Sequence, residues 1–266
     1  MKEQIQALLG GAQVIGGNLV WLDETASTNT YAKQLALEGA EHGTTVVADA
    51  QTAGRGRMDR SFHSPKGKGL YLSVVLRPKA PLQRLMCVTA LAGVAVCDAV
   101  ETVCGLRPGM KWPNDPVLGG RKICGILTEL MTPPEGSPVV ILGIGVNVLH
   151  TEEDFPPELR PIASSLAMEL GRPVDRLQLA AEVLRRLEET DAALNSGDWG
   201  EALHRYRRDC VHLGKQIRLM GPGGPETVTA LDVDERFGLV VLKANGEKTM
   251  VRSGEISVRG LFGYTE

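Results

Sequence analysis

The amino-acid sequence predicts an α+β fold, in which a mixed, largely antiparallel sheet is flanked by helices and followed by a small C-terminal β-barrel. Strands expected at 109–112, 123–131 and 139–148 follow one another without a helix between them, which favours antiparallel or mixed pairing over a doubly wound sheet. Residues 81–104 carry an apolar face too wide for a surface helix. After His212, short strands alternate with glycine-rich turns.

The first expected elements lie on either side of a basic loop that contains Arg55, Arg57 and Arg60. A strand expected at 18–23 leads into the hydroxyl and amide cluster 25–29, whose side chains can cap a helix over 30–37. β-branched residues predict a strand at 44–50, and alternating apolar residues predict another at 69–77. The basic loop therefore joins two strands.

The later elements are a helical block and the C-terminal strands. A long helix is expected over 175–194, with Asp175 as its N-cap and Gly197 just past its end, and a shorter helix over 199–208. The strands that follow are expected at 215–220, 227–233, 239–243, 248–251 and 256–259.

Length and composition limit the class of protein. At 266 residues the chain can form two unequal domains, which we place at 1–212 and 213–266. A net charge of -3 argues against a nucleic-acid surface spread over the whole molecule. Five cysteines without a CxxC pair, no secretory signal and no apolar run of about 20 residues predict a cytoplasmic protein without a membrane partner.

The segment Gly54-Arg55-Gly56-Arg57, followed by Arg60, is the most informative part of the sequence. Glycine allows the main chain to approach a ligand closely, and the arginine guanidinium matches phosphate or carboxylate oxygens. The loop therefore favours an anion site. In isolation, an ordinary solvated basic loop would explain the same residues.

Other segments suggest a cavity at the edge of the sheet. Lys111 ends a strand, because Pro113 cannot donate to a ladder, so its ammonium should project into a neighbouring cleft. Gly125 marks either a bulge or close approach of a ligand. The two glycines of 143–147 leave room for a flat group against the sheet, beside the amide of Asn147.

Missing motifs argue against a P-loop ATPase, a zinc protease and an α/β-hydrolase. The sequence has no Walker A run, no dinucleotide fingerprint, no HExxH and no GxSxG. Its five histidines show no metal-ligand spacing, and Trp112 is expected to be a core residue.

These segments together resemble the biotin protein ligases in order and approximate spacing. The matching segments are Ser27-Thr28-Asn29, 51–57, 111–115, Arg121-Lys122 to 125–127, 143–147 and 254–257. The resemblance implies a class II synthetase-like catalytic domain with an SH3-like C-terminal barrel. It also implies that biotin and ATP form biotinyl-5′-AMP, from which biotin passes to a lysine of a biotin carboxyl carrier domain.

The resemblance assigns roles by position in this sequence. Lys111 and Arg55 are implied as catalytic residues. Biotin binding is implied for Ser27, Thr28, Asn29, Gln51, Arg55, Gly56, Arg57, Lys111 and Gly125. Nucleotide binding is implied for Arg55, Arg57, Arg60, Asn114, Lys122 and Asn147. Mg²⁺ is expected on the polyphosphate, held by substrate oxygens and water without a dedicated protein cage.

Two features depart from the family pattern. The family loop continues Gly-Arg-Gly-Arg-x-Gly-Arg-x-Trp, whereas this sequence has Asp59 in place of the third glycine and Phe62 in place of the tryptophan. Because the charge of Asp59 would partly offset that of the arginines, we expect weaker retention of the adenylate. The chain before Ser27 is too short for the helix-turn-helix of some family members, so we expect no binding to DNA.

A homodimer is a reasonable expectation from the resemblance. The alternatives are a lipoate-type ligase, which shares the fold and the adenylation step, and a non-catalytic biotin-binding module.

Overall fold

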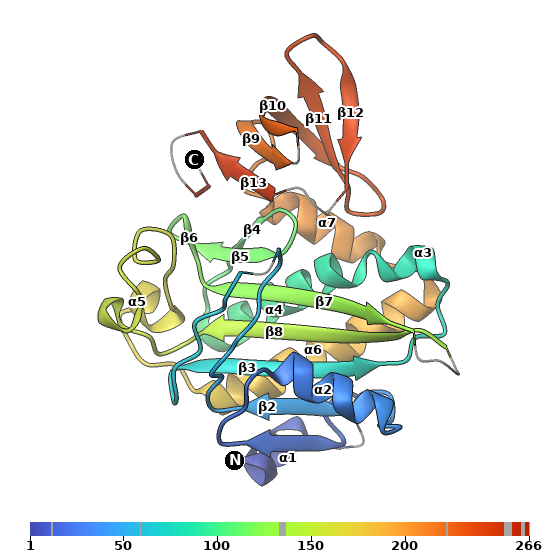
Figure 1. The fold of residues 1–266 in the computed structure, drawn as a ribbon, viewed down its shortest axis with the longest axis vertical. Helices are drawn as coiled ribbons and strands as arrows, with labels where there is room; N and C mark the ends of the chain where they lie inside the picture. Colours follow the sequence, from blue (N-terminus) through green and yellow to red (C-terminus); the bar gives the residue numbers. More distant parts are fainter. Residues whose placement is uncertain are drawn as a thin grey trace.

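A five-stranded sheet forms the centre of the protein (Figure 1). The computed structural model describes residues 1–266 except 12, 59, 133–136, 222, 253–256, 262–263 and 266. The sheet order is β1 (Leu19–Leu22), β2 (Thr45–Ala48), β3 (Gly69–Leu76), β8 (Val139–Asn147) and β7 (Cys124–Met131). Only the β1–β2 pair in this sheet is parallel, which confirms the prediction of a mixed, largely antiparallel sheet.

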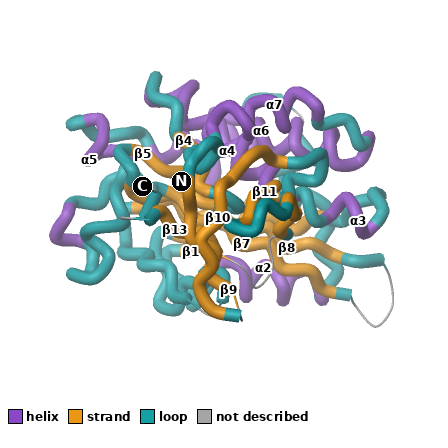
Figure 2. The backbone as a smooth tube through the Cα atoms, turned by 90° about the horizontal axis from the view of Figure 1, so that it is seen from above, coloured by secondary structure: helices purple, strands orange, loops and turns teal. Residues whose placement is uncertain are grey.

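Helices cover both faces of this sheet. Figure 2 shows α4 (Val88–Cys104), α6 (Arg176–Ser196) and α7 (Gly200–Asp209) on one side of the strands and α2 (Thr28–Leu37) on the other. Strands β2 and β3 are consequently buried along their whole length, as the apolar runs of their sequences require. Helix α1 (Lys2–Leu9), which the sequence did not reveal, packs against α6.

The helix expected over 81–104 is divided in two. A single turn, α3 (Leu82–Leu85), precedes α4, and Met86 and Cys87 lie between the two helices. Leu82 and Met86 are 54% and 60% exposed, so the buried apolar face belongs almost wholly to α4. The prediction of one continuous helix was wrong, because a two-residue turn at Met86 and Cys87 separates α3 from α4.

Helix α6 begins and ends where the sequence indicated. The carboxylate of Asp175 accepts hydrogen bonds from the backbone N–H groups of Leu177 and Gln178, and Gly197 takes the left-handed conformation that ends the helix. Two shorter elements were not expected, the 3₁₀ turn Glu152–Asp154 and α5 (Leu166–Leu170). They lie in the connection between β8 and α6.

A small antiparallel sheet extends from the segment that carries Lys111. It consists of β4 (Gly109–Lys111), β5 (Asp115–Leu118) and β6 (Arg121–Lys122). Lys111 pairs with Asp115 across β4 and β5, so the segment expected to be a simple turn is a tight hairpin. This hairpin holds the two side chains in a fixed register.

The C-terminal strands form a separate antiparallel sheet at the top of Figure 1. Its order is β12 (Lys248–Val251), β11 (Leu239–Lys243), β10 (Gly224–Val233), β9 (Gln216–Gly221) and β13 (Ser257–Gly260). The predicted SH3-like barrel is not confirmed, because the described residues show no pairing that closes β12 onto β13. Residues 254–256 of the late motif lie outside the described residues.

The C-terminal sheet packs closely on the rest of the molecule. The indole N–H of Trp112 donates to the carbonyl oxygen of Phe237 over 2.9 Å, and Phe237 packs edge-on against Tyr206. Trp112 is fully buried, as the sequence predicted. All five cysteines are free and buried, and none of the described helices is long and apolar enough to cross a membrane.

Candidate functional site

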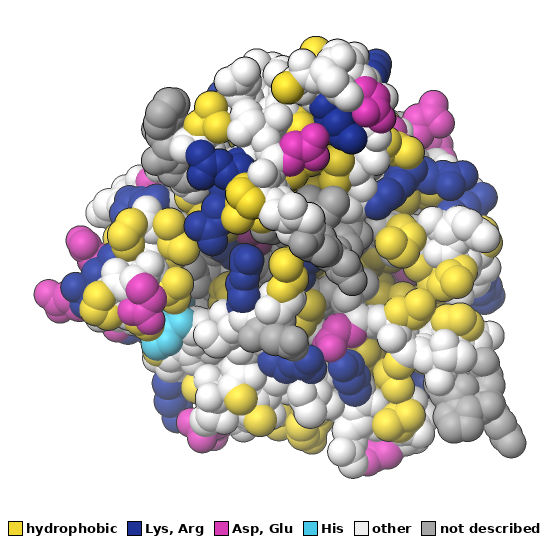
Figure 3. Space-filling view, turned by 45° about the horizontal axis from the view of Figure 1, so that its top comes forward, with side chains coloured by type: hydrophobic (Ala, Val, Ile, Leu, Met, Phe, Trp, Pro, Cys, Tyr) yellow, Lys and Arg dark blue, Asp and Glu magenta, His cyan; other side chains and the backbone are white. Residues whose placement is uncertain are grey.

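One cavity of about 260 Å³ lies where the Gly/Arg loop, residues 54–60, crosses β7 and β8 and meets the β4–β5 hairpin. All side chains or backbone positions predicted for the site line this cavity: Ser27, Thr28, Asn29, Gln51, Arg55, Gly56, Arg57, Arg60, Lys111, Asn114, Lys122, Gly125 and Asn147. Segments far apart in the sequence therefore meet, although their individual roles stay predictions. Figure 3 shows Lys and Arg side chains gathered along the middle of this face.

Hydroxyl and amide groups form one end of the cavity. The Oε1 of Gln51 accepts hydrogen bonds from the backbone N–H of Thr28 over 2.9 Å and from its hydroxyl over 3.2 Å. The Nε2 of Gln51 donates to Ser64 Oγ over 2.8 Å. Ser27 occupies the N-cap position of α2, makes no side-chain capping hydrogen bond and lines the cavity.

Asn29 is held by protein partners on both sides of its amide. Its Nδ2 donates to Glu129 Oε2 over 2.8 Å, and its Oδ1 accepts from Ser73 Oγ over 2.6 Å. A Cβ at Gly143 would lie 2.0 Å from that Oδ1. Gly143 is therefore required by the amide of Asn29, which the sequence did not reveal.

The Gly/Arg loop forms a compact turn. The backbone N–H of Gly56 donates to the carbonyl oxygen of Arg60 over 2.7 Å, and that of Phe62 donates to Gly54 over 2.8 Å. A Cβ at Gly54 would lie 2.3 Å from the carbonyl oxygen of Phe62, so only glycine fits there. The loop joins β2 to β3, as predicted, and Asp59 lies outside the described residues.

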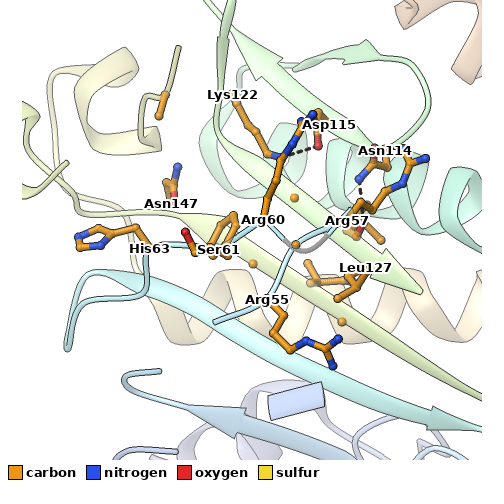
Figure 4. A pocket seen from close by; sticks show the side chains of 18 of the residues that line it. Arg55, Arg57, Arg60, Ser61, His63, Asn114, Asp115, Lys122, Leu127 and Asn147 are labelled. Carbon is orange, nitrogen blue, oxygen red and sulfur yellow. Dashed lines mark hydrogen bonds and ion pairs between the residues drawn. The ribbon is translucent and has the colours of Figure 1, made fainter. Parts of the chain in front are cut away.

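The three arginines point in different directions (Figure 4). Arg57 Nη1 donates to Asn114 Oδ1 over 3.0 Å. Arg60 extends toward Asp115. Arg55 points away from both and forms an ion pair with Glu129 over 3.3 Å, with 44% of its side chain exposed. Arg55, Arg57 and Arg60 all line the cavity, and the ion pair of Arg55 with Glu129 also connects the loop to β7.

Lys111 presents a buried ammonium to the cavity. Burial lowers its pKa to about 8, with the carboxylate of Asp115 working in the opposite direction. Lys111 forms no ion pair with any residue that the structure describes. Its charge therefore remains available to an anionic ligand.

Asp115 is the acidic member of the site. Lys122 Nζ lies 2.6 Å from its Oδ1, and the hydroxyl of Tyr264 donates to its Oδ2 over 2.5 Å. Burial works to raise the pKa of Asp115, but the charges of Lys122 and Lys111 hold it below its ordinary value. Asp115 is therefore ionised at neutral pH and its two oxygens are occupied.

The glycines of β7 and β8 do leave room for a flat group, and that group here is the ring of Phe62. A Cβ at Gly145 would lie 2.6 Å from Phe62 Cε1, and one at Gly125 would lie 3.2 Å from Cε2. Phe62 also packs edge-on against Tyr71 with ring centroids 6.4 Å apart. The ring forms part of the cavity wall.

The other end of the cavity combines Asn147 with apolar side chains. Asn147 Nδ2 donates to the carbonyl oxygen of Ser164 over 3.0 Å, which leaves its Oδ1 without a donor among the described residues. The apolar wall beside it is formed by Phe155, Leu159, Ile162 and Ala163. These residues suit a flat heterocycle with a polar edge.

Some residues of the site were missed by sequence reasoning. Ser73 contacts Asn29, and Glu129 contacts both Asn29 and Arg55; nothing in the sequence indicated these contacts. Asp115 was visible as part of the strand-end segment, but its pairing with Lys111 depends on the hairpin. Tyr264 gave no signal, because the whole C-terminal sheet separates it from the other site residues.

The cavity offers few carboxylates that could bind a metal ion. Among the described residues there is no group of three or more His, Cys, Asp or Glu side chains able to hold a metal ion. Asp115 is the lone carboxylate among the described residues that line the cavity, and Lys122 and Tyr264 occupy its oxygens. These described residues do not form a protein cage for a divalent cation.

Comparisons with known proteins agree on one family. Residues 21–147 match the model of the biotin/lipoate A/B protein ligase family. The chain is 36% identical over 246 residues to the bifunctional ligase/repressor BirA of Bacillus subtilis, spanning 92% of this chain and 75% of that protein. It is 34% identical over 255 residues to the biotin–acetyl-CoA-carboxylase ligase of Mycobacterium tuberculosis, spanning 92% of each.

A solved structure of a biotin protein ligase is also similar to this chain. The biotin protein ligase from Aquifex aeolicus in complex with biotin and ATP superimposes with a TM-score of 0.81 at 32% identity, covering 91% of this chain and 99% of that chain.

Proposed function

This chain belongs to the biotin protein ligase family, and we propose that its cavity joins biotin and ATP as biotinyl-5′-AMP and transfers the biotinyl group to a lysine of a carboxylase carrier domain. One observation carries the proposal. The Gly/Arg loop and Lys111 line the same cavity, with hydroxyl and amide groups at one end and cations beside them. Such a cavity suits a neutral ring bearing a carboxylate that must meet a phosphate.

Biotin binds with its ureido ring at the polar end. The hydroxyls of Ser27 and Thr28 and the amide of Gln51 offer the donors and acceptors that a buried ureido group needs. Ile126, Leu127 and Ile144 supply an apolar wall for the rest of the molecule. Asn29 supports this end by fixing its neighbours rather than by a free polar atom.

The first step is attack by a carboxylate oxygen of biotin on the α-phosphorus of ATP. A new P–O bond forms, the bond to the bridging oxygen breaks, and pyrophosphate leaves. Two anions must approach each other, so Arg57, Lys111 and Lys122 stabilise the charge that both bring to the transition state. The buried position of Lys111 strengthens this interaction, because little water screens it.

The nucleotide lies beyond the reacting atoms. Asn147 and the apolar wall beside it receive the adenosine, and Arg60 and Asn114 lie nearer the phosphates. A Mg²⁺ ion on the polyphosphate would neutralise part of its charge, and substrate oxygens and water would have to hold it, because the oxygens of Asp115 already have partners.

In the second step the amine of the acceptor lysine attacks the acyl carbonyl of biotinyl-5′-AMP. The new C–N bond forms as the C–O bond to AMP breaks, and the amine loses a proton. Lys111 and Arg57 remain beside the phosphate and stabilise the departing AMP.

Two further parts of the proposal concern the C-terminal domain and the cellular compartment. We propose that residues 213–266 form an SH3-like domain, supported by the antiparallel order of β9 to β13. The five free cysteines support a reducing, cytoplasmic setting.

The test is to incubate the protein with ATP and either biotin or lipoate and to measure pyrophosphate release. The proposal predicts release with biotin and transfer to a carrier domain, whereas release with lipoate alone would identify the lipoate-type alternative. A Lys111→Ala variant separates an enzyme from a biotin-binding module. It should lose carrier modification, and modification at the wild-type rate would contradict the role of Lys111.

A further inference from the structure

The C-terminal end of the chain reaches into the cavity beside Lys111. The phenol ring of Tyr264 lies under the ammonium, with Lys111 Nζ 4.4 Å from the ring centroid. Thr265 is 6% exposed, and its hydroxyl donates to the carbonyl oxygen of Gly120 over 3.2 Å. The end of the chain is therefore attached to the turn between β5 and β6.

Tyr264 makes a second contact, with Asp115, whose carboxylate charge acts on Lys111. Its hydroxyl donates to Asp115 Oδ2 over 2.5 Å, while Lys122 occupies Oδ1. Lys111 is the register partner of Asp115 across β4 and β5, yet the two form no ion pair within the described part of the chain. The hydroxyl of Tyr264 takes the acceptor that Lys111 would otherwise use.

The contacts of Tyr264 with Lys111 and with Asp115 leave the hydrogen-bond donors of the ammonium available. An aromatic face attracts a cation through its quadrupole and uses no directed N–H···O hydrogen bond. The three N–H donors of Lys111 therefore stay available for phosphate oxygens.

We propose that Tyr264 is a positioning residue for adenylation. It holds Lys111 over its ring and occupies Asp115, so that the ammonium is presented to the α-phosphate and not to the carboxylate. This inference rests on the proposed function, and it adds a residue from the far end of the sequence to the site.

Several other groups act on Lys111 from the elements around it. Besides burial, the charges of Lys122, Arg259 and Arg60 lower its pKa, and the charge of Asp115 raises it. His212 is buried nearby, and burial and the charge of Lys111 keep its pKa low at about 3, so it is neutral. If Asp115 were released by loss of the Tyr264 hydroxyl, the pKa of Lys111 would rise.

The test is the pH profile of biotin-dependent pyrophosphate release in Tyr264→Phe, which keeps the ring and removes one oxygen atom. We expect kcat to fall about tenfold, the size of one charge-assisted hydrogen bond. The KM for biotin should change little, and the alkaline limb should move to higher pH. Tyr264→Leu, which also removes the ring, should lose more activity.

Tyr31→Phe is the matched control, because Tyr31 is 37% exposed and lies outside the cavity. It should leave both kcat and the profile unchanged. A Tyr264→Phe profile with the alkaline limb at the wild-type pH would overturn the inference, whatever the change in kcat. Absence of pyrophosphate release from the wild-type protein would count against the proposed function instead.

Discussion

The guanidinium of Arg57 donates a hydrogen bond to Asn114 Oδ1 over 3.0 Å. This contact attaches the Gly/Arg loop to the hairpin that carries Lys111, three residues earlier in the sequence. A glycine-rich loop and a rigid strand end thereby face the same ligand volume (Figure 4). In the proposed reaction both cations act on one phosphate, and cations held in place by the protein need little reorganisation when charge develops there.

The pH dependence of adenylation should show an alkaline limb near pH 8. Lys111 must be protonated to stabilise the phosphate, and burial lowers its pKa to about 8. The rate of biotin-dependent pyrophosphate release should therefore fall as pH rises through that value, once ATP and biotin are saturating. In Lys111→Arg, which stays charged, the residual rate should lack this limb, and an unchanged limb would show that another group titrates.

Lys111→Met should make the protein more stable at pH 7 and inactive in adenylation. The unfolded chain binds the lysine proton up to an ordinary pKa of 10.5, but the folded chain releases it near 8, so the buried charge opposes folding below about pH 10.5, and the penalty is complete below about pH 8. Its removal should raise the free energy of unfolding by about 1–3 kcal/mol at pH 7. Urea denaturation at pH 7 and pH 10.5 checks this, since most of the difference should disappear at the higher pH.

Gly143→Ala should disrupt the polar end of the cavity. The added Cβ would lie 2.0 Å from Asn29 Oδ1, so the amide must leave Ser73 or the strand must shift. We expect a loss of about 1–3 kcal/mol in unfolding free energy and a higher KM for biotin. Gly200→Ala is the control, because its Cβ would meet nothing within 4 Å. Equal behaviour of the two variants would argue against a role for Gly143.

Restoring the family loop pattern should slow the loss of adenylate. In the sequence, Asp59 adds a negative charge between Arg57 and Arg60, and Phe62 occupies the position of the tryptophan in the family pattern. The variant Asp59→Gly with Phe62→Trp should therefore hold biotinyl-5′-AMP longer. Gel filtration of the preformed complex, with release followed over time, measures this. A wild-type complex that stays intact for hours would show that the two departures do not matter.

The fold was largely predictable because its signals are local. Asp175 and Gly197 gave the ends of α6, and the glycines of 54–56 and 143–145 marked places where a Cβ does not fit. The convergence of the loop and Lys111 came from the family resemblance and not from spacing. The β5–β6 hairpin was missed because short strands with Pro116 and a Gly-Gly turn resemble a loop.

The remaining features of the site depend on long-range packing. The pairing of Arg55 with Glu129, the support of Asn29 by Ser73 and the insertion of Tyr264 each join segments that no periodicity connects. Homodimer formation and the absence of DNA binding stay predictions, and sedimentation and an operator gel shift would measure them.

The most direct measurement of the central claim is a double-mutant cycle on the rate of biotinyl-5′-AMP formation, using Arg57→Ala, Lys111→Ala and the combined variant. If both cations act on one phosphate, their effects are coupled, and the double variant should lose much less than the product of the two single losses. Losses that multiply fully would contradict the claim, because the two groups would then act on separate parts of the reaction.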